Sequence, residues 1–321
     1  MTAAHAWTSA LDPAGPQAAH EARLFWFFFG VTGVVFVVVL AALALAIAAS
    51  RKRRDESAHE RQARDRRAER FVSIGIVTTV VILFVLLISS VRTGRLLASL
   101  QSTPAVSVSV IGHRWWWEVT YDDQVAGRRV LTANELHIPT GQPIAVSVTS
   151  RDVIHSFWVP ALQGKRDLIP GYTTTLWLQA DRPGLYHGQC AEFCGRQHAR
   201  MAIDVVAESG QEFSAWLDRQ RQPAQPPSTD TERRGRDVFV NGTCATCHTI
   251  TGTRAHGQLA PDLTHIASRA RLASATIPNL PGHLAEWIRN PQSFKPGSEM
   301  PPQMLAADDL EALRRYLESL E

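Results

Sequence analysis

A compact group of metal-binding side chains stands out in the second half of the sequence. Two thiols, an imidazole and a thioether fall within twelve residues, at Cys190, Cys194, His198 and Met201. Soft ligands of these types favour copper, and His155 is available upstream to complete the set. The spacing alone also fits zinc, or thiols and a histidine aligned along one face of a helix. Glycines at positions 188 and 195, and the methionine that follows the histidine, favour a copper site in a loop.

A second group follows at Cys244, Cys247 and His248, in the pattern C-x-x-C-H. In this pattern two thioether bonds attach a haem, and the histidine binds its iron from one side. A methionine on the opposite side would raise the haem potential into a range suited to accepting electrons. All four cysteines of the chain are therefore assigned to metal or haem rather than to disulfides.

Two long apolar stretches near the start of the chain would anchor these groups to a membrane. Residues 24–49 and 71–91 contain no charged side chain, and each can cross the roughly 30 Å hydrocarbon core as a helix. Two buried helices of a soluble core would be shorter. Residues 51–70 hold nine Lys or Arg against five Asp or Glu, which places this loop in the cytoplasm. The sequence thus predicts a transmembrane helical hairpin over residues 24–95, after an external segment at 1–23.

Residues 105–207 consist of short runs rich in β-branched and aromatic residues, separated by turns with Gly and Pro. The pattern predicts an all-β sandwich, with strands at 105–111, 144–150, 173–179 and 202–206.

A connecting segment and a last domain follow the predicted sandwich. Ser209 and Glu212 form a capping box ahead of a short helix, and the Pro-rich stretch 223–228 predicts a semi-rigid linker, so residues 208–230 connect two domains. Residues 231–321 have the apolar spacing of a compact all-α domain. The chain is therefore expected to be multidomain: a transmembrane hairpin, a β-sandwich and a helical domain.

Residues 105–207, including both ligand segments, resemble the cupredoxin domain of cytochrome c oxidase subunit II, which houses the dinuclear copper A centre. The resemblance implies six ligands: His155, Cys190, Glu192 through its backbone carbonyl, Cys194, His198 and Met201. The two cysteines would bridge the copper ions, each histidine would bind one, and the methionine would be a weak ligand. The Glu192 carboxylate would bind a magnesium ion shared with subunit I.

Residues 231–321 resemble class I cytochromes c over nearly their whole length. Besides the C-x-x-C-H pattern, the resemblance rests on Gly235 and Phe239 in a first helix and on leucines at helical spacing in residues 308–320. These features imply a covalently attached haem c.

Two further positions of this domain are assigned through the same resemblance. Residues 295–301 are similar to the family's ligand loop, which implies Met300 as the second iron ligand. Met304 is the rival, but it borders the last helix and is expected to be a core residue. Pro261 resembles the proline whose carbonyl holds the imidazole of His248.

Two more residues receive roles from the subunit II family. Trp115, in the aromatic stretch 112–118, matches the tryptophan through which electrons enter, and Trp116 and Trp117 are expected to be packing residues. Glu69 aligns with a glutamate at the mouth of a proton path into subunit I. The Trp and Pro that follow that glutamate in the family are missing here, so a solvated loop carboxylate is the alternative.

The combined resemblance implies subunit II of a proton-pumping respiratory oxidase. Electrons would pass from haem c to copper A and on to subunit I, where oxygen is reduced to water. Expected partners are subunits I and III, an upstream cytochrome or quinol-oxidising complex as electron donor, and membrane lipid. The expected location is the bacterial inner membrane, with multiple spans and with both metal domains on the periplasmic side. The net charge of +3 gives no indication of nucleic-acid binding.

Two other functions would use similar centres. One is a free-standing, membrane-tethered electron shuttle, and the other is a component of a nitric oxide or nitrous oxide reductase. Copurification with a haem-copper subunit excludes the first, and turnover with oxygen rather than nitrogen oxides excludes the second. A quinol-oxidase subunit would share the fold but lack the copper ligands.

Overall fold

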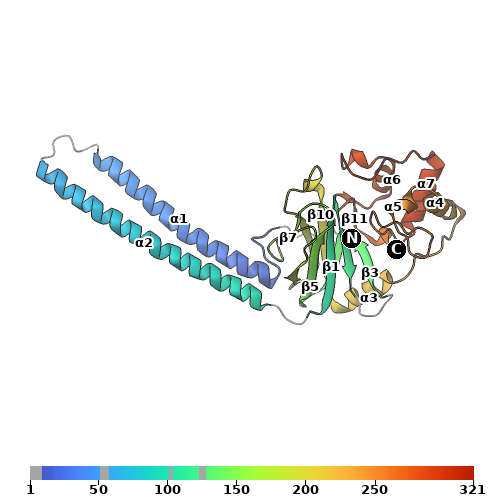
Figure 1. Ribbon diagram of the computed structural model, residues 1–321, viewed down its shortest axis with the longest axis horizontal. Coiled ribbons are helices and arrows are strands. Elements are labelled where there is room, and N and C mark those ends of the chain that lie inside the picture. Colours follow the sequence, from blue (N-terminus) through green and yellow to red (C-terminus); the bar gives the residue numbers. More distant parts are fainter. Residues whose placement is uncertain (1–8, 51–57, 101–103, 123–127) are drawn as a thin grey trace. The chain divides into compact units, whose positions relative to one another are not determined.

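The computed structural model describes residues 9–50, 58–100, 104–122 and 128–321 (Figure 1). It divides into two compact units. Ala19–Leu100 forms the helical unit, and Gln101–Glu321, with the segment up to Ala18, forms the other. The first eight residues of the expected external segment and positions 51–57 of the basic loop lie outside the described residues.

The helical unit contains α1 (Pro16–Ser50) and α2 (Ala58–Ser99), both long and apolar enough to cross a membrane. Their apolar side chains are exposed along most of both helices, as expected where lipid rather than protein surrounds a helix. The helices extend beyond the predicted spans at both ends. In particular, residues 58–70 of the expected loop form the first turns of α2, because this stretch is rich in the good helix formers Ala, Arg, Glu and Gln.

The sandwich consists of two five-stranded sheets, in the orders β3-β2-β1-β5-β8 and β4-β10-β9-β6-β7. The strands are β1 (Val106–His113), β2 (Trp116–Tyr121), β3 (Val130–Ala133), β4 (Glu135–Pro139), β5 (Ile144–Ser150), β6 (His155–Trp158), β7 (Arg166–Leu168), β8 (Thr174–Leu178), β9 (Gly184–Cys190) and β10 (Ala202–Glu208). The four strands predicted from the sequence are β1, β5, β8 and β10.

The core of the sandwich follows from the alternation of apolar residues along its strands. In β5 every second residue is buried, and β1 lies parallel to it so that Val108 pairs with Val146 and Val110 with Val148. Trp117 and Phe157 are completely buried and contact each other edge to face. The buried Cys190 and Cys194 belong to the same apolar cluster, so the copper-ligand segment is built onto the end of the core.

The predicted capping box at Ser209 and Glu212 is confirmed, and it starts α3 (Gly210–Gln220). The linker that follows is not a free spacer. The Ala224 amide donates to the Thr251 carbonyl at 2.9 Å, and Pro223 lies against Gly252. The linker is therefore attached to the last domain at two neighbouring points.

The last domain is helical, with α4 (Asp230–Asn241), α5 (Cys244–Cys247), α6 (Pro281–Arg289) and α7 (Ala307–Glu318), and a short hairpin of β11 (Arg271–Leu272) and β12 (Ile277–Pro278). The first and last helices pack together at Gly235, where a Cβ atom would come within 2.0 Å of the Ala312 carbonyl oxygen. A larger residue at position 235 would separate the two helices. Phe239 is buried on the same helix, as predicted.

Candidate copper and haem sites

The structure brings the predicted copper ligands together at one end of the sandwich. His155 begins β6, Cys190 ends β9, and the other ligands lie in the turn before β10. The two cysteine sulfurs are 3.7 Å apart, and each lies near one histidine: Cys190 Sγ is 3.9 Å from His155 Nδ1, and Cys194 Sγ is 3.7 Å from His198 Nδ1. The two remaining groups also lie next to a sulfur, with Met201 Sδ 3.9 Å from Cys194 Sγ and the Glu192 carbonyl oxygen 3.2 Å from Cys190 Sγ.

This donor set fits a soft metal. Ligand atoms of His155, Cys190 and Cys194 lie within 4.8 Å of one another, and all three residues are buried. The hydrogen bond between the two thiols lowers the pKa of Cys190, and the same bond raises the pKa of Cys194, because the pair can lose its first proton easily but not its second. Two thiolates, two imidazoles and a thioether, with no ligating carboxylate, suit copper better than a hard cation.

Asp152 orients one of the histidines. Its carboxylate accepts a hydrogen bond from His155 Nε2 at 2.8 Å, so that Nδ1 faces Cys190. Burial lowers the pKa of His155, but the hydrogen bonds to Cys190 and Asp152 outweigh burial, and the pKa is raised overall. The other carboxylate oxygen accepts from the Arg114 amide at 2.7 Å. Asp152 therefore joins the copper ligands to the aromatic segment of β1 and β2.

The three adjacent tryptophans have different surroundings. Trp115 is half-buried, and its Nε1 donates to the Cys194 carbonyl at 2.8 Å. Trp116 stacks on His113 with ring centres 4.3 Å apart, and Trp117 is completely buried. Trp115 is thus hydrogen-bonded to the backbone of Cys194, whereas Trp117 packs edge to face against His155, with ring centres 6.0 Å apart.

Two predicted carboxylates lie outside these clusters. The Glu192 side chain is partly exposed, and its carboxylate is 3.4 Å from Lys165 Nζ. Glu69 lies exposed on α2, in the helical unit.

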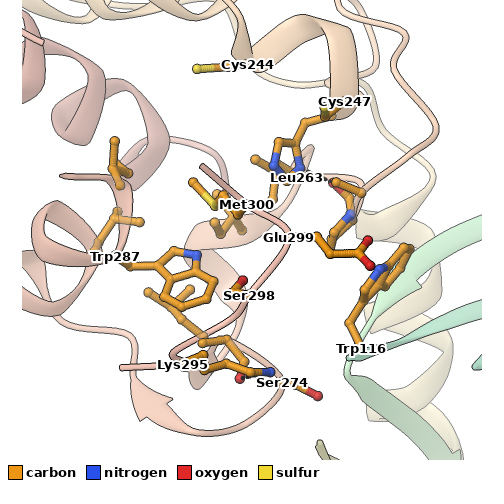
Figure 2. Close-up of a pocket in the computed structure, with 18 of the residues that line it drawn as sticks. Trp116, Cys244, Cys247, Leu263, Ser274, Trp287, Lys295, Ser298, Glu299 and Met300 are labelled. Atoms are coloured by element: carbon orange, nitrogen blue, oxygen red, sulfur yellow. Dashed lines mark hydrogen bonds between the residues drawn. The ribbon is translucent and has the colours of Figure 1, made fainter. Parts of the chain in front are cut away.

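A cavity of about 390 Å³ contains the residues predicted for haem attachment. It is lined by Cys244, Cys247, His248 and Met300, together with apolar side chains such as Phe239, Leu284, Trp287 and Leu313. Figure 2 shows Cys244 and Cys247 at one end of the cavity, Lys295 and Ser274 at the other, and Met300 between them. A volume in this range and a mostly apolar lining are typical of sites for cofactors.

The environment of His248 also fits a haem ligand. Its Nδ1 donates to the Pro261 carbonyl at 2.7 Å, which confirms the predicted hydrogen bond and leaves Nε2 as the nitrogen that can bind iron. Burial lowers the pKa of His248 and so keeps the imidazole neutral, as a metal ligand must be.

The expectation for Met304 was wrong. Its side chain is 98% exposed and does not line the cavity, because the residues before α7 follow the surface rather than the core. Met300, in contrast, faces the cavity (Figure 2).

The sequence reasoning missed two residues at these sites. Asp152 carries a usable signal, since it lies three residues before His155 and a metal-bound histidine commonly donates its other N–H to a carboxylate. Lys295 carries no such signal: it is a lysine in a polar loop, yet it is 4% exposed.

Comparisons with known proteins match both of the soluble domains. The family model described as "Cytochrome C oxidase subunit II, periplasmic domain" matches residues 106–208, and the one described as "Cytochrome c" matches residues 232–321. The cytochrome c oxidase subunit 2 of Alkalihalophilus pseudofirmus is 33% identical over 98% of this chain and 91% of its own length. The protein of the same name from Bacillus sp. strain PS3 is 30% identical over 77% of this chain and 73% of its own length.

A crystal structure of the periplasmic domain of subunit II of cytochrome oxidase from Bradyrhizobium japonicum is 30% identical, covers 36% of this chain and 94% of that chain, and has a TM-score of 0.35. The full-length relative and the two matched domains, taken together, show that the chain belongs to the cytochrome c oxidase subunit II family and carries a cytochrome c domain after the periplasmic copper domain.

Proposed function

We propose that this chain passes electrons from a haem c in its cytochrome domain to a copper A centre in its cupredoxin domain, and from there to subunit I of the oxidase, where oxygen is reduced to water and protons are pumped. Family membership establishes an oxidase subunit with a copper domain and a cytochrome c domain. The residue assignment rests on one observation. Two thiols, two imidazoles and a thioether converge, and each of their donor atoms lies within 3.9 Å of another donor atom of the group.

The copper pair is assigned to the six predicted ligands, and each has a distinct task. Cys190 and Cys194 would bridge the two ions, and His155 and His198 lie next to different sulfurs, so each would bind a different ion. Met201 and the Glu192 carbonyl would complete the two coordination shells. Because most of these groups are buried in the sandwich core, the protein excludes water and holds the ligands in nearly fixed positions.

The haem is assigned to Cys244, Cys247, His248 and Met300. The short helix α5 places both thiols and the histidine on the wall of one cavity, while Met300 approaches from the loop before α7. When bound, the haem and the copper pair supply reversible one-electron chemistry. The chain itself attaches them, orients His248 through Pro261 and shields the haem with apolar side chains.

The remaining assignments concern the surroundings of these centres. Trp115 is proposed as the residue through which electrons reach the copper pair, because its ring donates to the Cys194 carbonyl. The Glu192 carboxylate is proposed as a magnesium ligand at the contact with subunit I, and Glu69 as the mouth of a proton path.

The wider assignments extend to the membrane and to other proteins. They comprise a transmembrane hairpin at residues 24–95 in a bacterial inner membrane, subunit III as a further partner, and an upstream cytochrome or quinol-oxidising complex as the donor. Two long apolar helices support the membrane anchor, and the family model's description of residues 106–208 as a periplasmic domain supports the placement of the metal domains on the periplasmic side.

Metal analysis of the purified complex tests this function. Beyond the copper and haem of the haem-copper subunit, we expect two copper ions and one haem c per copy of this chain, with an electron paramagnetic resonance spectrum of one unpaired electron shared by two copper ions. Zinc in place of copper, or a spectrum of isolated copper ions, would contradict the proposal. Recovery of the chain without a haem-copper subunit would favour a free electron shuttle.

A further inference from the structure

Two loops that carry metal ligands lie directly against each other. The copper loop (residues 190–201) contains Cys194, and the methionine loop (residues 294–301) contains Met300. The side chain of Gln197 donates to the Pro296 carbonyl at 2.5 Å, and the side chain of Arg200 donates to the Phe294 carbonyl. The cytochrome domain is thus attached to the cupredoxin domain through the backbone of its own haem-ligand loop.

Lys295 makes the deepest of these contacts. Its ammonium group donates to the Trp115 carbonyl at 2.9 Å and to the Ala273 carbonyl at 3.3 Å, and the residue is 4% exposed. Burial lowers the pKa of Lys295 to about 7. Removing an ammonium group from water is costly, and the two neutral carbonyls compensate only in part. Packing alone would favour an apolar side chain at position 295. The presence of a lysine, with its N–H donors, therefore needs another explanation.

The geometry on the far side of Trp115 supplies that explanation. The indole Nε1 donates to the Cys194 carbonyl, so Trp115 is held at its main chain by the cytochrome domain and at its ring by the copper loop. Two hydrogen bonds therefore connect the methionine loop to a cysteine of the copper pair. Gly195 makes this fit possible, because a Cβ atom there would come within 3.0 Å of the Trp115 ring.

We propose that Lys295 is a positioning residue for electron transfer between the two centres: its hydrogen bond to the Trp115 carbonyl fixes the tryptophan between the methionine loop and Cys194. The inference rests on the proposed function, since it concerns the transfer from haem c to copper A. Electron tunnelling depends steeply on separation and on the intervening bonds. Loss of this one contact should therefore slow transfer without changing either metal site.

The Lys295→Met variant of the intact oxidase complex tests this role, because methionine matches the lysine side chain as far as Cε and removes the donor. Haem c is reduced by a photochemical reductant, and electron arrival is followed at the copper absorption band. We expect unchanged haem and copper spectra and potentials, with transfer slowed roughly tenfold, as a small misplacement of reacting groups can do. A rate within about twofold of the unmodified complex would overturn the assignment.

A matched control separates positioning from general loosening of the domains. Thr276 Oγ1 donates to the Arg200 carbonyl at 3.2 Å, a hydrogen bond between the same two domains that does not involve Trp115. Thr276→Val should leave the rate nearly unchanged, and an equal slowing in this variant would overturn the specific role of Lys295. If Lys295→Met does not assemble, Lys295→Leu is measured instead, since leucine also removes the donor; an unchanged rate would again overturn the inference. Absence of haem-to-copper transfer in the unmodified complex would instead refute the proposed function.

Discussion

The copper site and the haem site of this chain are built in different ways. At the copper site the donor atoms contact one another, at 3.7 Å between the sulfurs and at 3.7–3.9 Å from sulfur to histidine or methionine, and the apolar core of the sandwich surrounds them. At the haem site, by contrast, the candidate residues line a cavity. The candidate copper ligands thus hold one another in place through direct contacts. The candidate haem residues instead form the wall of a cavity, to which the haem would be attached covalently.

The two histidines also differ in the group that accepts their hydrogen bond. His155 donates to the carboxylate of Asp152, whereas His248 donates to the backbone carbonyl of Pro261. A side-chain acceptor can be removed by one substitution, but a backbone carbonyl remains whatever residue occupies the position. We therefore expect the copper site to be the more sensitive of the two to changes outside its ligands.

The largest expected effect is a complete loss at one site with no change at the other. Cys194→Ser removes a sulfur that contacts Cys190, His198 and Met201 and is proposed to bridge the copper ions, so the shared copper signal should disappear. The haem absorption should persist, because the haem cavity is lined by side chains of a separate apolar cluster. Electron paramagnetic resonance and haem absorption on one preparation measure both outcomes. Survival of the copper signal would refute the ligand assignment.

The local part of this architecture could be predicted from sequence. The order of domains, the strand pattern of β5 and the capping box at Ser209 follow from apolar periodicity and short-range hydrogen bonding. Ligands within the copper loop are likewise close in sequence.

Features that depend on contacts between distant segments could not be predicted. The burial of Lys295 requires Trp115, which lies in another domain, and no local pattern indicates it. The exposure of Met304 was also missed, because proximity to a helix does not determine which way a loop residue faces.

The second largest effect is expected at Met300, the proposed sixth ligand of the haem iron. Met300→Leu should change the spin state of the haem and lower its potential by a fraction of the roughly 0.8 V range that axial ligands span. Met304→Leu is the matched control, since this exposed residue lies away from the cavity, and neither property should move. Optical spectra and redox titration of both variants provide the measurement. A spectral change in the Met304 variant alone would reverse the choice of ligand.

A smaller effect is expected from the support of the copper histidine. Asp152→Ala removes the acceptor of His155 Nε2, and loss of such a partner typically weakens metal binding by about 10- to 100-fold. Competition with a copper chelator measures the change. Pro261→Ala is the comparison at the haem site; it keeps the backbone carbonyl, so the haem spectrum should be retained. If both variants left their metal sites unchanged, the contrast between side-chain and backbone support would be wrong.

The stability of the cupredoxin domain should depend on pH. His137 in β4 lies between Glu135 and Glu208, at 2.8 Å and 2.9 Å. Burial lowers the pKa of His137, but the bonds to the two carboxylates outweigh burial, and the pKa is raised overall. The stabilisation is therefore fully present below the unfolded pKa, about 6.5, and is lost as pH rises through the folded pKa. Thermal unfolding of the cupredoxin domain, followed by copper absorption, should show this loss, and His137→Gln should remove it.

The smallest effects would show whether the two domains unfold separately. The cupredoxin domain ends with α3, which has a capping box of Ser209 and Glu212 and packs on the sandwich through Phe213 and Trp216. The cytochrome domain begins with α4, which has a capping box of Thr229 and Glu232. Ser209→Ala and Thr229→Ala should each cost about 1 kcal/mol, because each leaves a helix N–H without its side-chain acceptor. In the intact complex, Ser209→Ala should lower the unfolding midpoint reported by copper absorption, and Thr229→Ala the one reported by haem absorption. Equal shifts of both signals in either variant would mean that the contacts around Lys295 make the two domains unfold as one.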